Sequence, residues 1–360
     1  MSFRIAKKLW FTLLLVLTIL AVWIYGQFQT RAIAQVEPSS AITQPTTDAS
    51  SAARAPLLLG FYTSGYVGSQ SVIDRELRTI DDWVGQQSSL VGMFLDIEDE
   101  NPAYNVTQQL ETLRDNGYTA FINLKSHRTA TEIAQGTIDH QIRAIARAYV
   151  NWADQGERVA FIAPLQEMNI AGESYARDPE NFKLAYQRIQ TIFQEAEVPA
   201  PSVKWVFAPN GWSENEFHRF ENYYPGSEKV DVVAFSGYNW GYCRNSSWVH
   251  WSTTDEVFTP YIQRMQTMAP GKPIFVAQTA STSDTANGVS DRDKNQWLQD
   301  TYAYLASIPD IQGALYFNIH KECDWTLFDD HHRYEGYRQT VTANPAFRYV
   351  DPQTIAATNF

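Results

Sequence analysis

The clearest chemical candidate in this sequence is one carboxylate, Glu167, in the stretch VAFIAPLQEMN at residues 159–169. The stretch begins as a short apolar run, as a buried parallel strand does, and it turns polar at its end. A carboxylate at the carboxyl end of a buried strand lies where α/β barrels build their active sites. Burial beside aromatic rings would raise its pKa and suit it to donate a proton. We therefore predict that Glu167 is a general acid.

Glu167 belongs to a regular alternation of apolar and amphipathic stretches. The strand-like stretches are residues 57–62, 90–97, 119–125, 159–169, 203–210, 230–241, 273–280 and 311–318. The helix-like stretches are residues 72–84, 106–117, 139–154, 179–196, 256–268 and 294–305, with a weaker one after residue 333. Eight strand–helix units in about 290 residues are typical of a (β/α)8 TIM barrel. An open doubly wound sheet is the alternative, but no G-x-G-x-x-G follows the first strand to support a dinucleotide site. We predict the barrel, over residues 56–350.

The segments outside the barrel have different compositions. Arg4, Lys7 and Lys8 precede the uncharged apolar run 9–25, and Ala-Ile-Ala follows at 32–34. Residues 1–34 are therefore expected to be a cleaved signal peptide or a retained membrane anchor, and the sequence leaves both open. Residues 35–55 are rich in Ser, Thr, Ala and Pro, which predicts a disordered linker. Residues 351–360 are expected to form a C-terminal tail. The barrel would thus be exported, either secreted or held outside the membrane by the N-terminal segment.

Charge and composition limit the partners. The formal net charge of −12 argues against nucleic acid or an anionic membrane surface. Aromatic residues make up 14% of the chain, enough to fill a core or to line a groove for the flat faces of sugar rings. The histidines follow no metal-ligand spacing, so we expect neither a metal nor a cofactor. Cys243 and Cys323 could form a disulfide or remain buried thiols.

Polar and aromatic residues gather at the predicted strand ends. They are Asp96 and Glu98, Lys125 and His127, Gln166 and Asn169, Asn210 and Trp212, Tyr238 and Trp240, Gln278, and finally Asn318, Glu322, Asp324 and Trp325. Carboxylates, amides and stacking rings at one rim are what a glycosidase cleft requires. The alternative is a purely structural role, in which the polar groups are solvated loop ends and the rings belong to the core.

Several motifs make the chain resemble glycoside hydrolase family 26, which contains retaining β-mannanases and related β-glycanases. They are PLQEMN at residues 164–169, VVAFSGYNWG at 232–241, KPIFVAQTAST at 272–282 and ALYFNIHKECDW at 314–325. The resemblance extends over nearly all of residues 57–328. It implies a (β/α)8 barrel with an acid/base Glu after strand four, matched by Glu167, and a nucleophile Glu on strand seven. It also implies that Tyr238 hydrogen-bonds the strand-seven side chain.

Two positions depart from the family pattern. The family's mannanases usually carry His before the acid/base residue, where this chain has Gln166. At the nucleophile position the chain has Gln278 instead of Glu. A neutral amide can neither attack an anomeric carbon as a carboxylate does nor stabilise an oxocarbenium-like transition state by its charge. The double-displacement reaction of the family is therefore not implied.

Two functions stay open. The first is hydrolysis of a β-mannan or related β-glycan, with Glu167 as acid and Asp96, Glu98, Glu322 or Asp324 as base or nucleophile; in a less favoured variant, a 2-acetamido group of the substrate attacks. The second is an inactive barrel that binds a glycan. In either, a polysaccharide or oligosaccharide is the partner. Trp240 and Trp325 are the predicted stacking rings, and Tyr238, Asn210 and Gln166 are further predicted contacts.

Overall fold

The computed structural model describes residues 55–153, 157–243, 250–284, 291–358 and 360. The predicted signal or anchor at 1–34, and the linker up to residue 54, lie outside these residues. Within the described part of the chain, no helix combines the length and the apolar character needed to cross a membrane.

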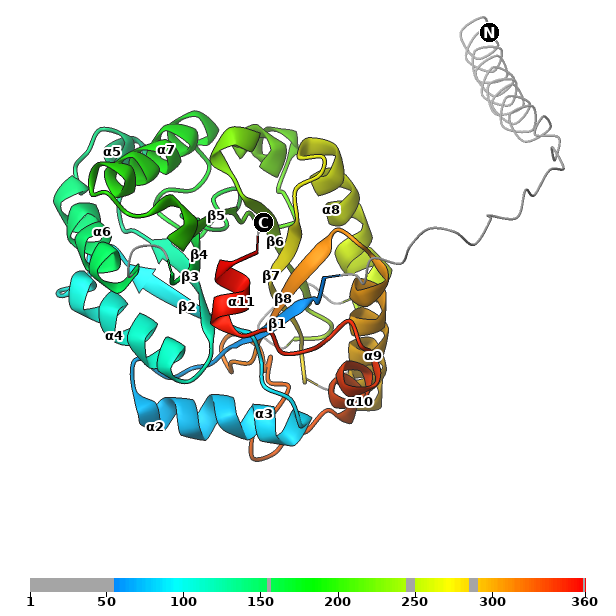
Figure 1. The fold of residues 1–360 in the computed structure, drawn as a ribbon. Helices are drawn as coiled ribbons and strands as arrows, with labels where there is room; N and C mark the ends of the chain where they lie inside the picture. Colours follow the sequence, from blue (N-terminus) through cyan, green and yellow to red (C-terminus); the bar gives the residue numbers. More distant parts are fainter. Residues whose placement is uncertain (1–54, 154–156, 244–249, 285–290, 359) are drawn as a thin grey trace, which may run out of the picture. The chain divides into compact units, whose positions relative to one another are not determined.

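The structure is a closed barrel of eight parallel strands in sequence order, which confirms the predicted (β/α)8 fold (Figure 1). The strands are β1 (Leu58–Tyr62), β2 (Leu90–Asp96), β3 (Thr119–Lys125), β4 (Ala160–Pro164), β5 (Val203–Phe207), β6 (Val232–Asn239), β7 (Ile274–Ser281) and β8 (Ile311–Phe317). β8 closes on β1 through the register Leu58↔Gly313 to Tyr62↔Phe317. Because all strands run the same way, their carboxyl ends share one rim.

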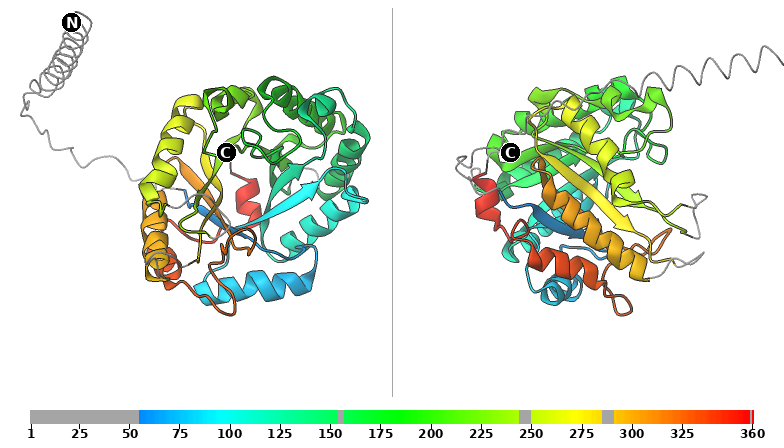
Figure 2. Two further views of the ribbon diagram at one scale, coloured as in Figure 1. Left: turned by 180° about the vertical axis from the view of Figure 1, so that it is seen from behind. Right: turned by 90° about the vertical axis from the view of Figure 1, so that its right-hand side faces the viewer.

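Helices surround the barrel, most of them along its outside (Figures 1 and 2). They are α2 (Gln70–Val72), α3 (Arg78–Val84), α4 (Pro102–Asp115), α5 (Ala130–Ala134), α6 (Asp139–Ala153), α7 (Pro179–Glu195), α8 (Thr254–Met268), α9 (Asp291–Ser307), α10 (Glu335–Ala343) and α11 (Pro352–Ala356). A π-helical turn, η1 (Ile73–Leu77), joins α2 to α3, and short 3-10 turns η3 (Ala200–Ser202), η4 (Glu216–His218), η5 (Phe220–Tyr223) and η6 (Ser227–Lys229) lie between α7 and β6.

Aromatic rings fill the barrel interior near the amino ends of the strands. Phe121 on β3 and Phe275 on β7 have ring centroids 6.4 Å apart, although their strands lie on opposite sides of the barrel. Phe161 on β4 lies 5.1 Å from Phe275. The ring of Phe275 also covers its register partner Gly313, where an added Cβ would come within 2.6 Å of it. The interior is therefore packed at this end, as in other barrels of this class.

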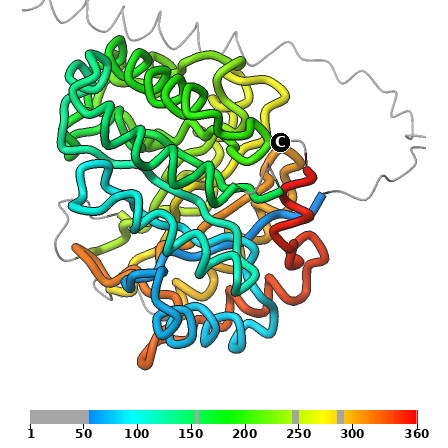
Figure 3. The backbone as a smooth tube through the Cα atoms, turned by 60° about the vertical axis from the view of Figure 1, so that its left-hand side comes forward, coloured from blue at the N-terminus to red at the C-terminus, as the bar shows by residue number. Residues whose placement is uncertain are grey.

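Residues 351–358 and 360, from the segment expected as a tail, pack against the barrel. Asp351 caps α11 by accepting bonds from the backbone of Gln353 and Thr354, and α11 lies across the amino-terminal opening of the barrel (Figure 1). Phe360 then contacts Phe161 at 5.2 Å between ring centroids. In Figure 3 this segment (red) runs beside the start of β1 (blue). One end of the barrel is thus covered, and the polar rim lies at the other.

Candidate active site

Glu167 lies in a tight turn directly after β4. Leu165 and Glu167 both have left-handed backbone conformations, with φ of 56° and 55°. The turn is held by backbone bonds from Leu165 N to Leu124 O at 2.8 Å and from Glu167 N to Ala208 O at 2.9 Å. Left-handed conformations cost free energy for residues other than glycine and gather at functional sites. Bonds to both neighbouring strands, β3 and β5, offset this strain and fix the direction of the Glu167 side chain.

The carboxyl of Glu167 is partly buried and hydrogen-bonded. Asn210, which follows β5, donates from Nδ2 to Oε1 of Glu167 at 2.9 Å. Burial raises the pKa of Glu167 above its ordinary value of 4.5, and the polar side chains of Ser236 and Asn210 lower it in part. The net direction is upward. A carboxyl whose pKa is raised by burial keeps its proton at a higher pH and suits the role of general acid.

A short path crosses the strands from Glu167 to Gln278. Asn210 pairs with Ser236 of β6 as an isolated parallel bridge. Ser236 is in turn the register partner of Gln278 on β7. The four residues Glu167, Asn210, Ser236 and Gln278 therefore come from four consecutive strands or their ends. Gln278 is 4% exposed, and its Oε1 accepts a hydrogen bond from the Tyr238 hydroxyl at 2.9 Å. The bond implied by the family resemblance is present.

The aromatic wall beside Gln278 consists of Tyr238, Trp240 and Trp325. Trp240 meets Trp325 edge-on at 5.0 Å between ring centroids, and Trp325 lies 5.2 Å from Tyr238. Trp240 is partly exposed, as a stacking ring must be. Trp325 is only 1% exposed. The prediction that Trp325 offers an open face to a sugar is therefore wrong for this structure, because the neighbouring rings cover it; it supports the wall instead.

A disulfide joins the two loops that carry this wall. Cys243, three residues after Trp240, is bonded to Cys323, two residues before Trp325, with Cα atoms 5.5 Å apart. The sequence left bonded and free cysteines open, and the structure has them bonded. The backbone bond from Cys243 N to Trp240 O at 3.0 Å ties Trp240 to the same bridge. Among the described residues, Cys243, Cys323 and Asp284 form the one cluster with metal-site spacing, but disulfide sulfurs are not the thiolates that bind metals.

The amides next to Glu167 organise its loop. Gln166 is 3% exposed, and its backbone oxygen accepts a bond from the Tyr175 hydroxyl at 3.1 Å. A side chain so buried can contact a substrate only at the bottom of the barrel's opening at the carboxyl ends of the strands, which we call the mouth. Asn169 donates to the backbone oxygens of Asn210 and Trp212, each at 3.0 Å. The β4 and β5 loops are thus bonded together around Glu167.

Two exposed rings at this end of the barrel were not among the predicted contacts. Phe94 of β2 is 40% exposed. It is the register partner of Asn123, whose amide inside the barrel donates to the Tyr62 hydroxyl at 2.7 Å. Phe94 therefore faces the barrel mouth, and its ring lies 5.3 Å from that of Tyr62. Trp212, after β5, is 53% exposed. In the sequence, Phe94 sits in the apolar run LVGMFLDI, where nothing distinguishes it from a core residue.

The other predicted carboxylates differ in their surroundings. Glu98 accepts bonds from Ser126 Oγ at 2.7 Å and Arg128 Nε at 2.8 Å; burial raises its pKa, but these bonds bring it below the ordinary value. Asp96 pairs with His127 at 2.7 Å.

The two carboxylates after β8 also differ. Burial raises the pKa of Asp324, but hydrogen bonds from Thr326 outweigh this effect, so its net pKa is lowered. Glu322 accepts a bond from the indole of Trp325 at 3.2 Å.

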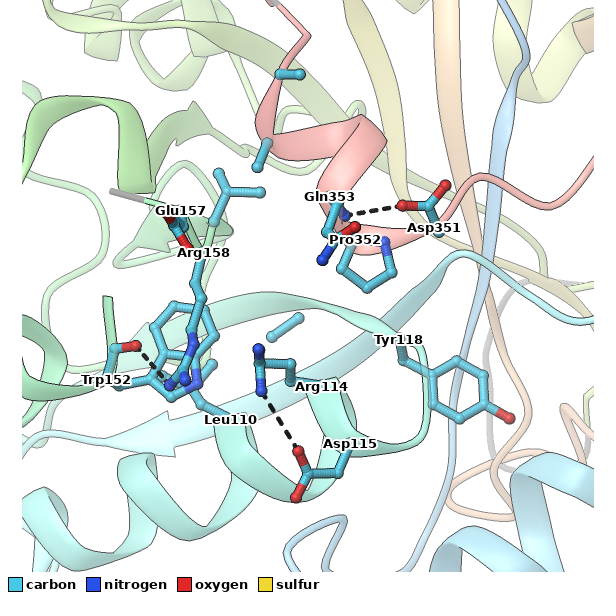
Figure 4. A pocket seen from close by; sticks show the side chains of 14 residues that line it. Leu110, Arg114, Asp115, Tyr118, Trp152, Glu157, Arg158, Asp351, Pro352 and Gln353 are labelled. Carbon is cyan, nitrogen blue, oxygen red and sulfur yellow. Dashed lines mark hydrogen bonds and ion pairs between the residues drawn. The ribbon is translucent and has the colours of Figure 1, made fainter. Parts of the chain in front are cut away.

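A sizeable pocket lies away from these groups. It has a volume of about 770 Å³ and is lined by Arg114, Tyr118, Trp152, Arg158, Asp351 and Gln353, among others (Figure 4). Tyr118 precedes β3 and Arg158 precedes β4, so the cavity opens at the amino ends of the strands. Since Glu167 and Gln278 lie at or near the carboxyl ends, this cavity is not the candidate active site.

Comparison with solved structures identifies the barrel type. The catalytic domain of a Bacillus sp. JAMB-750 GH26 endo-β-1,4-mannanase superposes with a TM-score of 0.61 at 13% identity, over 85% of this chain and 90% of that one. A modular endo-β-1,4-mannanase from Cellulomonas fimi, described as glycoside hydrolase family 26, gives 0.59 at 13% identity, over 83% and 72%. This chain has the fold of glycoside hydrolase family 26. At these identities, the family-26 likeness concerns the fold alone.

One curated protein is also similar in sequence. Endoglucanase H of Acetivibrio thermocellus is 26% identical over 300 residues, which are 79% of this chain and 31% of the relative. The chain thus spans about a third of that protein's length. No family model matches the chain.

Proposed function

We propose that this protein hydrolyses a β-linked polysaccharide, a β-mannan or related β-glucan, with Glu167 as the general acid. The observation that carries the proposal is the carboxyl of Glu167: it stands in a strained turn at the carboxyl end of β4 and is hydrogen-bonded by Asn210. Burial raises its pKa. A protonated carboxyl in this position can give its proton to the glycosidic oxygen as the bond to the anomeric carbon breaks.

The substrate class follows from the rings around the mouth and from the names of similar proteins. Phe94, Trp212 and Trp240 offer exposed or partly exposed faces, which suit the apolar faces of sugar rings. The solved neighbours include mannanases, one of them in complex with a gluco-manno-oligosaccharide, and the sequence relative is an endoglucanase. β-1,4-linked mannose and glucose chains are therefore the first substrates to test.

Residue 278 excludes one mechanism for this chain. An amide cannot form a covalent glycosyl ester as a carboxylate does. Gln278 instead occupies the nucleophile position of the family and accepts the hydrogen bond of the Tyr238 hydroxyl. Of the routes that remain, the proposal takes a single displacement by water, with a second carboxylate as base.

The first experiment is reducing-sugar release from soluble mannans, glucans and xylans by residues 55–360. Wild type should release product, and Glu167→Gln should lose about 100-fold or more of the rate, as expected when a general acid is removed. Glu197→Gln is the matched control, because Glu197 also has a left-handed backbone (φ 62°) but follows α7, away from the rim. Equal activity of wild type and Glu167→Gln would exclude Glu167 as the acid.

Glycan binding without turnover is the second candidate, favoured by Gln278 alone. It predicts tryptophan fluorescence quenching by a glycan in a wild-type protein that releases no reducing sugar. Absence of quenching with all three glycans would count against it.

We also propose that the barrel acts in an oxidising compartment outside the cytoplasm. Two observations support this location: the basic and apolar N-terminal sequence at residues 1–25 and the Cys243–Cys323 disulfide. Disulfides persist in exported proteins and are rare in the cytosol. Fractionation of the native host, with detection of the barrel by antibody, tests the location.

A further inference from the structure

The closed barrel determines which loop faces Glu167. In the strand order β1 to β8, β4 and β8 lie four positions apart in either direction, so the loops that follow them stand on opposite sides of the mouth. Glu167 follows β4, and Glu322 follows β8. We propose that Glu322 is the general base of an inverting hydrolysis; this inference rests on the proposed role of Glu167 as acid.

Contacts on the Gln278 side of the mouth hold Glu322 in place. Trp325 donates from Nε1 to Oε1 of Glu322 at 3.2 Å. The Trp325 ring lies 5.2 Å from that of Tyr238, and Tyr238 is bonded to Gln278 at 2.9 Å. Glu322 is therefore linked by three contacts to the position from which a nucleophile would act. The adjacent disulfide at Cys323 restrains the same loop.

Electrostatic effects also connect the Glu322 loop with Glu167. Lys321 Nζ lies 3.6 Å from Oε2 of Glu322. Burial is the largest effect on the pKa of Glu167 and raises it, whereas the charge of Lys321 lowers it. Burial raises the pKa of Tyr238, and the charges of Glu167 and Glu322 add to the rise. The loop after β8 is thus near enough for the charge of Lys321 to act on Glu167, although the two strands are on opposite sides of the barrel.

Other carboxylates at the rim are less suited to this role. Asp96 and Glu98 follow β2, only two strands from β4, and pair with His127 and Arg128. Glu173 belongs to the same loop as Glu167 and pairs with Lys125 at 2.6 Å, so it stands on the side of the acid.

Asp324 lies in the Glu322 loop but is used to fold it. Its Oδ1 accepts bonds from the backbone nitrogen of Thr326 at 3.1 Å and from the hydroxyl of the same residue at 2.5 Å. These bonds close a tight turn at residues 324–326 in the loop after β8. Glu322 is favoured for its place opposite Glu167 and its bond to Trp325, which packs on Tyr238.

The inverting reaction uses the two carboxyls from opposite faces of the sugar. Glu167 gives its proton to the glycosidic oxygen, and the bond from this oxygen to the anomeric carbon breaks with its electron pair going to the leaving oxygen. A water molecule forms the new bond to the anomeric carbon on the other face and gives a proton to Glu322. The products are a free hydroxyl on the leaving sugar and a hemiacetal of inverted configuration, so a β-linked substrate first yields the α-anomer. Proton exchange with water then restores both carboxyls.

Two variants test this assignment. Glu322→Gln keeps an acceptor for the Trp325 indole and should fold normally, but it should lose about 100-fold or more of kcat. Glu335→Gln is the matched control: Glu335 accepts a bond from the Trp83 indole at 3.1 Å on the outside of the barrel, so this change should leave kcat unaltered. Equal thermal midpoints for wild type and both variants would show that folding is preserved.

Product stereochemistry gives a readout that a structural role of Glu322 would not produce. Proton NMR of the first minutes of wild-type hydrolysis should show the α-anomer, and azide or formate should restore activity to Glu322→Ala. An active wild type that yields the β-anomer, or that is unaffected by Glu322→Gln, would overturn the assignment while leaving Glu167 as acid. A wild type inactive on every glycan would overturn the proposed function and the assignment of Glu322 together.

Discussion

The hydroxyl of Tyr238 donates to Oε1 of Gln278 across the β6–β7 boundary at 2.9 Å. A carboxylate at position 278 would accept the same bond, strengthened by its charge. The environment of residue 278 therefore suits a glutamate, although the chain has an amide there.

Gln278→Glu should convert the mechanism from single to double displacement. The new carboxylate can attack the anomeric carbon, so the first product should be the β-anomer, and a 2-fluoro glycoside should leave a covalent adduct visible in the intact mass. Gln278→Asp is the control, since its carboxylate is one methylene too short to reach. An unmodified mass for Gln278→Glu, with an unchanged product anomer, would show that residue 278 does not stand at the anomeric carbon.

Asn210→Ala should shift the pH profile as well as the rate. The amide of Asn210 stabilises the charged form of Glu167 through a 2.9 Å bond, so removing it should raise the Glu167 pKa further. The alkaline limb of kcat/KM, which reports the acid in the free enzyme, should move to higher pH. The rate should also fall, by about 10-fold, because the carboxyl loses its orientation.

The control for this change is Asn222→Ala, since the side-chain amide of Asn222 donates to the backbone oxygens of Glu216 and Phe217, in the η4–η5 segment. An alkaline limb that stays in place, or that moves to lower pH, would contradict the assignment of this limb to Glu167.

Phe94→Ala should weaken binding and leave chemistry intact. The ring is 40% exposed in the mouth and packs against Tyr62, which has no assigned part in proton transfer. Loss of a stacking face should raise KM by about 10-fold with kcat unchanged. Calorimetric binding of an oligosaccharide to the Glu167→Gln protein, with and without Phe94→Ala, measures the same effect without turnover. Tyr104→Ala, in α4 and 63% exposed, should change neither quantity, and equal affinities with and without Phe94 would remove it from the cleft.

Asp81 should make the stability of the barrel depend on pH. Burial raises its pKa from 3.8 to about 6, and bonds from Tyr118 and Ser88 only partly oppose this. Because the folded state holds the proton more tightly, the free energy of unfolding should fall as the pH rises from about 4 to about 6, by an amount on the order of 3 kcal/mol. Asp81→Asn cannot titrate and should lose this part of the slope.

Urea unfolding at pH 4.5 and pH 7 measures this difference for wild type and Asp81→Asn. Asp115→Asn, an exposed carboxylate in α4, should keep the wild-type slope. The same slope in all three proteins would mean that Asp81 is already ionised in the folded state at low pH.

The fold could be predicted because strand and helix periods are local properties of the sequence. All eight strands appear within a few residues of their predicted bounds, and the amphipathic stretch at 72–84 becomes α2, η1 and α3 without a break. Glu167 could be placed because a carboxylate at the end of an apolar strand has few other positions to take.

Exposure of individual rings could not be predicted, since it depends on which neighbours close over them. The sequence places Trp325 at the rim, but Tyr238 and Trp240 cover it. The apolar run around Phe94 predicts a core residue, but its ring is exposed in the mouth. The α11 segment is similar: nothing in DPQTIAATNF shows that it packs under the barrel until the contact of Phe360 with Phe161 is seen.

The Cys243–Cys323 bridge has a consequence for when the cleft is completed. It closes a loop of 80 residues between the two segments that carry Trp240 and Glu322, and such a bond cannot persist in a reducing cytosol. A newly made chain would therefore leave the ribosome with this side of the mouth unlinked, and the wall would be joined only by oxidation. Oxidation would thus be the step that completes this side of the cleft.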